Sequence, residues 1–289
     1  MKNLNEIRYH LRSIQQTRQI TNAMYLLSTS RMKKAMTHIE YNRHYFTRVR
    51  QTMKDIINKS RVVHHPYMKG EGEAQSAAYV VIAADKGLCG GYNTNVLNLA
   101  WEHIKDHPQR FIVTAGIMAT EFFRRKGVEP DIELLGLVQD PKLSLARELI
   151  DTIFRIYDEG LTDEIYVVYT HFINSTKQIP RIVRLLPLLL EDYEDVEYEY
   201  NYAGDILYEP SEEEVFSNLV PQYATGLVYG ALTMSYASEH SARMTAMQNS
   251  TKNADEMIDK LSSEYNSARQ YAITQEISEI GAGFQYEEE

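Results

Sequence analysis

The first 65 residues contain neither glycine nor proline, so nothing in their sequence interrupts a helix that runs through them. Between Leu4 and Ile56, apolar and aromatic residues recur at the a and d positions of a seven-residue repeat, except for four polar residues: Arg18, Thr21, Ser28 and Asn42. This repeat is typical of a left-handed coiled coil. A helix of this length would be roughly 80–90 Å long at 1.5 Å per residue. We therefore expect it to need a partner helix.

The last part of the chain provides that partner. Ser211 and Glu214 have the spacing of a capping box, which marks a helix start. Residues 231–280 contain no proline or glycine, and mostly small or apolar residues follow a 4,3 spacing from Met247 to Ala272. Pro221 is expected to kink or break the helix before that seam. Two terminal heptad helices separated by a compact insert pair most simply in an antiparallel arrangement.

Charge is distributed unevenly along the chain, which has a net charge of −10. Residues 1–60 hold 12 Lys and Arg against 3 Asp and Glu, whereas residues 211–289 hold 4 against 13. These opposite charges favour pairing of the two ends. A basic segment alone can indicate nucleic-acid binding, but its neutralising partner lies in the same chain. We predict no nucleic-acid partner.

The bulk composition indicates a globular protein without a membrane span. The chain is 44% hydrophobic and 24% charged, and no run of 18 apolar residues occurs in it. Its charged N-terminus lacks the apolar core of a signal peptide. The single cysteine, Cys89, allows no internal disulfide. We expect a cytoplasmic protein that does not insert directly into the membrane.

Between the heptad segments the period of the apolar residues changes. β-rich apolar runs occupy residues 77–85, 110–116, 131–138 and 163–172. Amphipathic helical stretches separate them near residues 95–106, 117–126 and 143–157. This alternation predicts a doubly wound, parallel α/β domain, with residues 179–188 as a candidate edge strand.

The segment DKGLCGGYN, residues 85–93, is the best candidate for enzyme chemistry. It follows the first expected strand and precedes a helix, a position at which α/β folds often bind phosphate. However, it matches neither GxxxxGK[ST] nor GxGxxG. A tight turn that requires glycine conformations accounts for its glycines better. Cys89 has no histidine or acid close in sequence that would activate it as a nucleophile.

Two features suggest a metal ion, and neither is sufficient. His103 and His107 have a spacing that suits two ligands on one helix, but no third ligand is evident. Residues 191–214 carry 11 acidic residues without the spacing of a calcium loop. We predict no metal, no cofactor and no catalytic residue in this chain.

Polar residues within the heptad segments point to protein contacts instead. The four polar seam positions cost stability while fixing the register of the helix pair. Arg18 among them either extends to solvent or meets an outside partner. Arg269, Gln270 and Thr274 lie in SEYNSARQYAITQEISEI, residues 263–280, away from the seam. From the residues alone, these three are either solvated or in contact with another protein.

Several motifs together resemble the γ subunit of F-type ATP synthases. Residues 7–35 contain TRQITNAM, similar to the family's basic helix with TRxITKAM, and residues 85–95 contain the family's D[RK]GLCGGxN. LLPL and YEP follow at 185–188 and 208–210. The C-terminal region contains ASEHSARMTAMQNSTKNADEMI and YNSARQYAITQEISEI. Because the motifs occur in the right order over nearly the whole chain, the resemblance is specific.

The resemblance implies a rotor. The terminal helices, residues 1–60 and 211–285, would form an antiparallel coiled-coil shaft inside a ring of alternating α and β subunits. A Rossmann-like α/β foot, residues 70–205, would be inserted between them and would sit on the ring of c subunits, next to the ε subunit. The chain would be a non-catalytic subunit at the cytoplasmic face of the cell membrane. It would couple ion flow through the c-ring to ATP synthesis or hydrolysis.

The matching motifs also carry the family's contact residues onto this chain. Arg269, Gln270 and Thr274 would meet the catch loops of the β subunits, and Met24 would lie near the β lever segment. Asn22 stands where the family usually has a lysine, which removes a charge from the lever-facing region.

In the foot, the resemblance implies that Tyr208 and Glu209 contact the polar loops of the c-ring. The family's γ subunit binds no nucleotide, in agreement with the missing phosphate-loop motif. Two other functions stay open from the residues alone. One is a coiled-coil scaffold that does not rotate, and the other is a nucleotide- or phosphate-binding α/β enzyme that uses residues 85–93.

Overall fold

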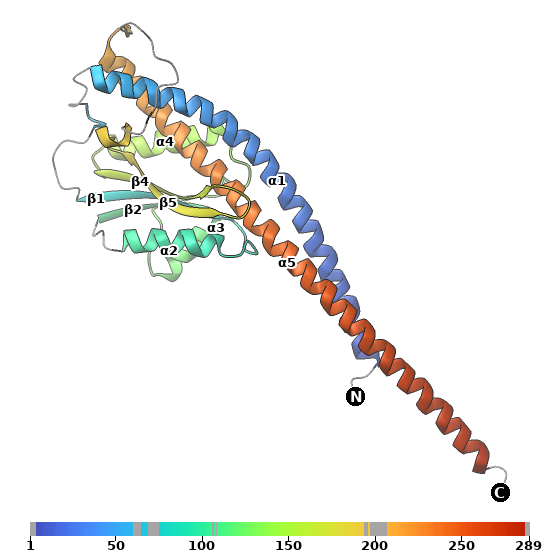
Figure 1. The fold of residues 1–289 in the computed structure, drawn as a ribbon. Helices are drawn as coiled ribbons and strands as arrows, with labels where there is room; N and C mark the ends of the chain where they lie inside the picture. The colour runs from blue at the N-terminus through green and yellow to red at the C-terminus, as the bar shows by residue number, and fades with distance from the viewer. Residues whose placement is uncertain are drawn as a thin grey trace. The chain divides into compact units, whose positions relative to one another are not determined.

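The computed structural model describes residues 4–59, 65–68, 75–105, 107, 109–193, 196 and 207–286. A long helix stands at each end of the chain, α1 (Leu4–Lys59) and α5 (Glu212–Tyr286) (Figure 1). The elements between them are, in chain order, β1 (Ser76–Ile82), α2 (Tyr92–Ile104), β2 (Gln109–Ala115), α3 (Ile117–Arg125), β3 (Ile132–Leu134), α4 (Leu143–Asp158), β4 (Glu164–Phe172), β5 (Gln178–Leu186) and a 3-10 turn (Leu190–Tyr193).

The contacts divide the chain into two compact units. One, called here the central unit, comprises residues 29–242. The other, the terminal unit, comprises residues 1–28 and 243–289. Helices α1 and α5 each contribute a segment to both units.

A five-stranded sheet in the order β3-β2-β1-β4-β5 forms the middle of the central unit. Its first four strands in chain order are mutually parallel, and β5 pairs antiparallel with β4 at the edge. The predicted doubly wound α/β domain and its edge strand are therefore confirmed. Strand β3 is shorter than the predicted run 131–138, because Leu135 is exposed and Gly136 takes a φ of 78° that turns the chain away.

Both faces of the sheet are covered, as expected for parallel strands. Along β1, Tyr79 and Val81 face a core made with α2 and α3, in which Phe123 of α3 is fully buried. The alternate residues Val80 and Ile82 belong to a second core, to which α1, α4 and α5 contribute. The fully apolar sequence of β1 follows from this burial on both sides.

Helix α5 continues through Pro221, so of the kink or break predicted there, the break is wrong. Proline removes one hydrogen bond from the helix ladder. Around this position, Phe216, Val220 and Ala224 are fully buried in the core of the central unit. Their burial, at roughly 25 cal/mol per Å² of apolar surface, offsets the missing bond.

Within the central unit, α1 and α5 pack against each other in opposite directions. His38 Nδ1 lies 3.4 Å from the Tyr229 hydroxyl, and Asn42 Nδ2 donates to the carbonyl of Gly226 at 3.1 Å. A Cβ atom at Gly230 would come within 2.9 Å of the Asn42 side chain, so glycine lets the helices approach there. Asn42, one of the four polar seam residues, thus bonds across the seam.

Within the terminal unit, the same two helices are again antiparallel. Three contacts set their register: Arg8 over the Tyr265 ring at 5.9 Å, Arg18 Nε to Asp255 Oδ1 at 2.8 Å, and Thr21 Oγ1 to Thr251 Oγ1 at 2.8 Å. The described a and d positions of α1 are buried or half-buried, apart from Arg18. The predicted antiparallel heptad pair is therefore confirmed. Arg18 is paired with the opposite helix, an arrangement that its sequence context did not predict.

None of the helices in the described ranges is long and apolar enough to cross a membrane.

Candidate functional site

The loop at residues 85–93, the candidate for enzyme chemistry, is built into the framework of the sheet. One carboxylate oxygen of Asp85 accepts a hydrogen bond from the Ile117 backbone N–H at 3.0 Å. The other accepts from Gln139 Nε2 at 2.7 Å. Asp85 therefore ties together the loops that follow β1, β2 and β3.

Asn93 and Cys89 stabilise the same loop from inside. Asn93 Oδ1 accepts from the buried backbone N–H of Ala84 at 2.9 Å. Its Nδ2 lies 3.4 Å from the Cys89 sulfur, and Cys89 is only 1% exposed. Leu88 and Gly90 have φ angles of 60° and 57°, which confirms the prediction of a tight turn. The polar groups of this loop hold the turn together, and the loop gives the phosphate-binding alternative no support.

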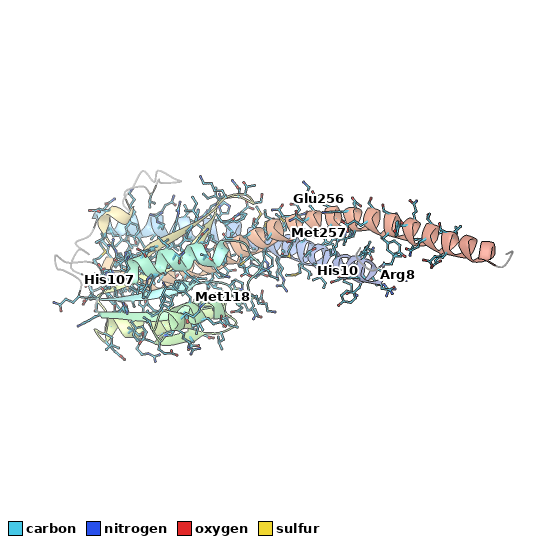
Figure 2. The ribbon with its side chains drawn as sticks, turned by 90° about the horizontal axis from the view of Figure 1, so that it is seen from below. Arg8, His10, His107, Met118, Glu256 and Met257 are labelled. Atoms are coloured by element: carbon cyan, nitrogen blue, oxygen red, sulfur yellow. The ribbon has the colours of Figure 1, made fainter. Side chains whose placement is uncertain are left out.

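His103 and His107 both bond to the hydroxyl of a buried tyrosine. Their Nδ1 atoms lie 3.0 and 3.1 Å from the Tyr79 hydroxyl. His107, labelled in Figure 2, also has its Nδ1 at 2.9 Å from the His103 carbonyl, so that nitrogen must carry the proton. Tyr79 then donates to His103. Burial lowers the pKa of His103, as does His107, while Glu164 opposes that shift.

The described parts of the chain contain no group of three or more His, Cys, Asp or Glu side chains arranged to hold a metal ion. Half of the acidic segment 191–214, residues 194–195 and 197–206, lies outside the described residues.

His65 lies between α1 and β1 and is only 8% exposed. Its Nδ1 accepts from the Tyr67 backbone N–H at 3.2 Å, and its Nε2 lies 2.8 Å from Ser217 Oγ. Its ring also packs edge-on against Phe216. Burial lowers the pKa of His65, and the charge of Glu213 opposes that shift. The histidine anchors residues 65–68 to the first turns of α5.

The two residues assigned to the c-ring contact differ in their surroundings. The Tyr208 hydroxyl donates to Asp55 Oδ2 at 2.7 Å, and its half-buried ring packs against the core of the central unit. Glu209 is exposed. Tyr208 thus ties the start of α5 to the end of α1.

The residues assigned to the β-subunit contact lie in the terminal unit, on two helices. Arg269, Gln270 and Thr274 are exposed on α5, and we call them the C-terminal polar surface. The hydroxyl of Thr274 donates only to the Gln270 carbonyl of its own helix, at 2.9 Å. In this unit α5 extends past the start of α1 (Figure 1). Because Arg8 lies over the Tyr265 ring, Arg269 and Gln270 are about level with the first turn of α1, and Thr274 lies beyond it.

Met24 lies at a different level of the helix pair. It is half-buried on α1, one turn from Thr21, which pairs with Thr251. Thr251 and Arg269 are separated by roughly 27 Å along α5, at 1.5 Å per residue. The structure therefore brings Arg269, Gln270 and Thr274 together on α5 but places Met24 at another level of the helix pair.

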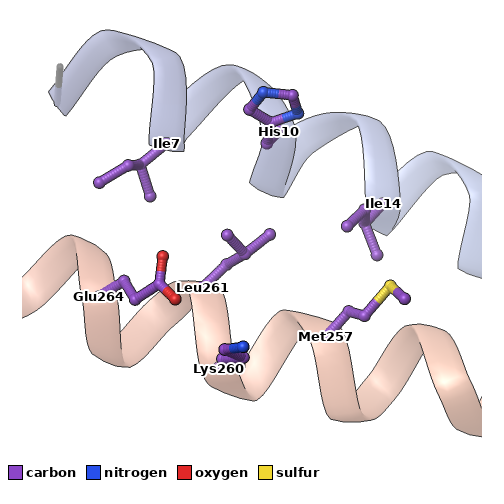
Figure 3. Close-up of a pocket in the computed structure, with 7 residues that line it drawn as sticks. All are labelled: Ile7, His10, Ile14, Met257, Lys260, Leu261 and Glu264. Atoms are coloured by element: carbon purple, nitrogen blue, oxygen red, sulfur yellow. The ribbon is translucent and has the colours of Figure 1, made fainter. Parts of the chain in front are cut away.

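A shallow groove of about 250 Å³ follows the helix seam of the terminal unit. Apolar side chains of the two helices point toward one another across it (Figure 3): Ile7, Ile14, Met257 and Leu261. Three polar or charged residues complete the lining: His10, Lys260 and Glu264. Figure 2 places His10 and Met257 on the facing helices. The groove reflects incomplete filling of the heptad seam near the start of α1.

Sequence reasoning missed a set of buried serines in α5: Ser235, Ser238 and Ser241. They recur every third residue, so they share one helix face. Serine is a weak helix former that bonds readily to nearby backbone. Serine repeated on one face of a helix could therefore have predicted a polar contact at that face.

Comparison with known proteins agrees with this geometry. A family model described as ATP synthase matches residues 3–285. The ATP synthase gamma chain of Ruminiclostridium cellulolyticum is 42% identical over 286 residues, with 97% of each chain covered. The sodium-ion-specific ATP synthase gamma chain of Acetobacterium woodii is 36% identical, with 98% of each chain covered.

Solved structures share the fold. A chain of the Euglena gracilis mitochondrial ATP synthase, solved as OSCP/F1/c-ring in rotational state 3, has a TM-score of 0.68 at 17% identity, with 98% of this chain and 93% of that chain covered. A chain of the Tetrahymena thermophila mitochondrial ATP synthase, solved as central stalk and c-ring, has a TM-score of 0.61 at 23% identity, with 80% and 98% covered. From its match to the family model and its identity to relatives over nearly their whole length, the chain belongs to the family of ATP synthase gamma chains.

Proposed function

We propose that this chain is the γ subunit of a bacterial-type F-type ATP synthase, the rotor of its central stalk. The observation that carries the proposal is the 42% identity to an ATP synthase gamma chain over 97% of both chains. In this role the chain is not itself catalytic. It couples ion flow through the c-ring to ATP synthesis or hydrolysis in the α/β ring.

Paired helices suit a shaft that transmits torque. A single isolated helix is marginally stable in water, and the apolar seam between two helices adds the stability and lateral stiffness that one helix lacks. In the terminal unit the seam is reinforced by directional contacts, the Arg18–Asp255 ion pair and the Thr21–Thr251 hydrogen bond. These contacts resist sliding of one helix along the other.

Rotation can change the catalytic sites only if each shaft orientation binds one β conformation better than the others. In our proposal the C-terminal polar surface supplies such contacts, because its exposed side chains make few bonds within the chain. Arg269 offers a planar cation that suits a carboxylate of the β catch loops. Met24 contacts the β lever segment at a separate level.

The α/β domain, residues 70–205, is proposed to be the foot, with the c-ring and the ε subunit as partners. Because the Tyr208 hydroxyl is bonded to Asp55, the exposed Glu209 is the better candidate for a direct polar contact with the c-ring. The assembled protein would lie at the cytoplasmic face of the cell membrane. The division into residues 1–60, 70–205 and 211–285 stays a prediction.

The proposal is tested by co-expressing the chain with the α, β and ε subunits encoded by the same genome. We expect a stable complex that contains this chain. Replacing Arg269 and Gln270 by alanine should leave the chain folded and assembled, but reduce ATP-driven ion pumping by roughly thirtyfold or more, as expected for the loss of a charged and a neutral hydrogen bond worth about 2 kcal/mol or more together.

Lys252→Ala on the same helix is the matched control, since the Lys252 side chain is 77% exposed. It should pump ions at the wild-type rate. Failure of the wild-type chain to co-purify with α and β would refute the rotor and favour a scaffold. Normal pumping by the double variant would refute the role of the two residues.

A further inference from the structure

Helix α5 bonds to the backbone of β4 at a point where no neighbouring strand among the described residues does so on that side. Strand β1 pairs with β4 only as far as Val168, whereas β4 continues to Phe172 next to β5. Thr170 lies in this extension, opposite Pro180 of β5. The N–H and C=O of Thr170 therefore need other partners on the side of β4 where β1 no longer pairs with it.

Two serines of α5 provide those partners. The N–H of Thr170 donates to Ser235 Oγ at 3.2 Å, and Ser238 Oγ donates to the carbonyl of Thr170 at 3.2 Å. In a strand, the N–H and C=O of one residue point to the same side. The N–H and C=O of Thr170 thus both point away from β5. Thr170 and Pro180 would share no backbone hydrogen bond in any case, so the N–H that proline lacks is not needed there.

A third serine holds the hairpin between β4 and β5. Ser241 Oγ donates to the Ser175 carbonyl at 2.8 Å and accepts from Gln178 Nε2 at 3.3 Å. The turn that presents Ser175 is itself closed by Asn174, whose Oδ1 accepts from the Lys177 backbone N–H at 2.9 Å. The hairpin therefore meets α5 as a preformed element.

The three serines are almost completely buried, Ser235 at 2% exposure and Ser238 and Ser241 at 0%. Apolar contacts between α5 and the sheet are non-directional and tolerate small sliding movements. Hydrogen bonds weaken steeply with distance and angle, and water cannot replace them in a buried interface. These bonds therefore fix the position of α5 along β4.

We propose that Ser235, Ser238 and Ser241 form a serine clamp through which force passes between the α/β domain and α5 when the chain rotates. The inference rests on the proposed rotor function. Three polar contacts in a row on one helix face resist both rolling and sliding of the helix, which torque would otherwise produce. The serines act as positioning residues.

The test uses the complete complex, with α/β rings fixed to a surface and a probe attached to the α/β domain of this chain. The measured quantity is the angular fluctuation of the probe while the catalytic sites are stalled. In a Ser235→Ala, Ser238→Ala, Ser241→Ala chain, the angular variance should rise by roughly twofold, since all the directional contacts of the clamp are lost. The rate of ATP hydrolysis should stay at the wild-type value.

Thr233→Val is the matched control. Thr233 is also buried in α5, but its hydroxyl donates only to the Tyr229 carbonyl of the same helix, at 2.7 Å. This variant should keep the wild-type variance even if its thermal stability falls. The clamp would be overturned if the triple serine variant showed the angular variance of wild type. It would also be overturned if Thr233→Val showed the raised variance of the triple variant.

The same assay separates the clamp from the rotor. A wild-type complex that does not rotate would overturn the proposed function and the clamp with it, whereas a rotating wild type with unchanged variants overturns the clamp alone. If the triple variant does not assemble, Ser235→Ala is measured in the same way. In that variant, hydrogen exchange at the Thr170 amide should also be up to about tenfold faster, because one hydrogen bond is lost. Wild-type exchange there would contradict the clamp.

Discussion

The central and terminal units use their polar residues in opposite ways. In the central unit, the side chains that resemble catalytic groups bond to other parts of the same unit: Asp85 bonds to Ile117 and Gln139, and Tyr79 bonds to two histidines. In the terminal unit, the C-terminal polar surface points outward. The difference indicates that chemistry-bearing residues of the α/β domain maintain its fold, whereas the polar side chains near the end of α5 stay available at the surface.

The largest effect is expected at Gly116, where the fold of the central unit tolerates no side chain. A Cβ atom there would lie 2.2 Å from the Ala83 carbonyl oxygen, at a φ of 102°. Gly116→Ala should lower the free energy of unfolding by about 3 kcal/mol or more, from strain and a backbone clash together. Urea unfolding of the full chain measures it.

Gly136→Ala is the control for that variant. Gly136 has a φ of 78°, but nothing lies within 4 Å of its Cβ position. Only the cost of the left-handed conformation remains, about 1 kcal/mol. Equal losses in the two variants would show that the contact with Ala83 is unimportant.

A smaller effect is expected when Asn93 is replaced by alanine. The buried N–H of Ala84 then loses its acceptor, which should cost about 1–3 kcal/mol of unfolding free energy. Differential scanning calorimetry can follow the loss. If the loop 85–93 served phosphate chemistry instead, the variant would keep its stability and lose binding of ATP or ADP measured by titration calorimetry.

The pH dependence of stability should expose the inward-facing histidines. The pKa of His65 is lower in the folded chain than its ordinary value of 6.5, so the unfolded chain binds the proton more readily. Neutral His65 therefore contributes its full share to the free energy of unfolding above pH 6.5. This contribution falls as the pH drops from 6.5 toward the lowered pKa of the folded chain. His103 has the same sign.

Urea unfolding at pH 7.5 and at pH 5.5 checks this expectation. The loss of stability between the two pH values should be smaller in His65→Gln than in wild type, because the variant no longer titrates at that position. The same loss in both chains would mean that protonation of His65 does not affect the anchor at residues 65–68.

The smallest effect is expected in the terminal unit, for the ion pair between Arg18 and Asp255. The two side chains are 44% and 49% exposed. A double-mutant cycle with alanine at both positions should give a coupling of about 0.5 kcal/mol that decreases with added salt. A coupling free energy above about 1.5 kcal/mol, the upper value for a typical hydrogen bond, would contradict this expectation. It would mean that this ion pair stabilises the terminal unit as strongly as the buried hydrogen bonds stabilise the central unit.

The sequence patterns predicted the periodic parts of the fold well. Helix α1 and the end of α5 follow from heptads, and the sheet follows from apolar runs separated by amphipathic helices. They failed at Pro221, where the burial of neighbouring residues outweighs a local rule. They also failed at Leu135, where one backbone conformation ends a strand early.

The partners of individual polar residues were harder to predict, because they depend on register between distant segments. Arg18 meets Asp255 across 237 positions of sequence, and Ser238 meets Thr170 across 68. Neither register is encoded near those residues. The exposure of Arg269 was easier to predict, since it lies off the seam of its own helix.

Rotation of this chain inside its own complex tests the account most directly. The α/β ring is fixed to a surface, a probe is attached to the α/β domain of this chain, and the angle of the probe is followed after addition of ATP. We expect stepwise turning in one direction at a rate set by ATP hydrolysis. Steady hydrolysis by a complex that contains this chain, with no directed rotation of the probe, would contradict the rotor.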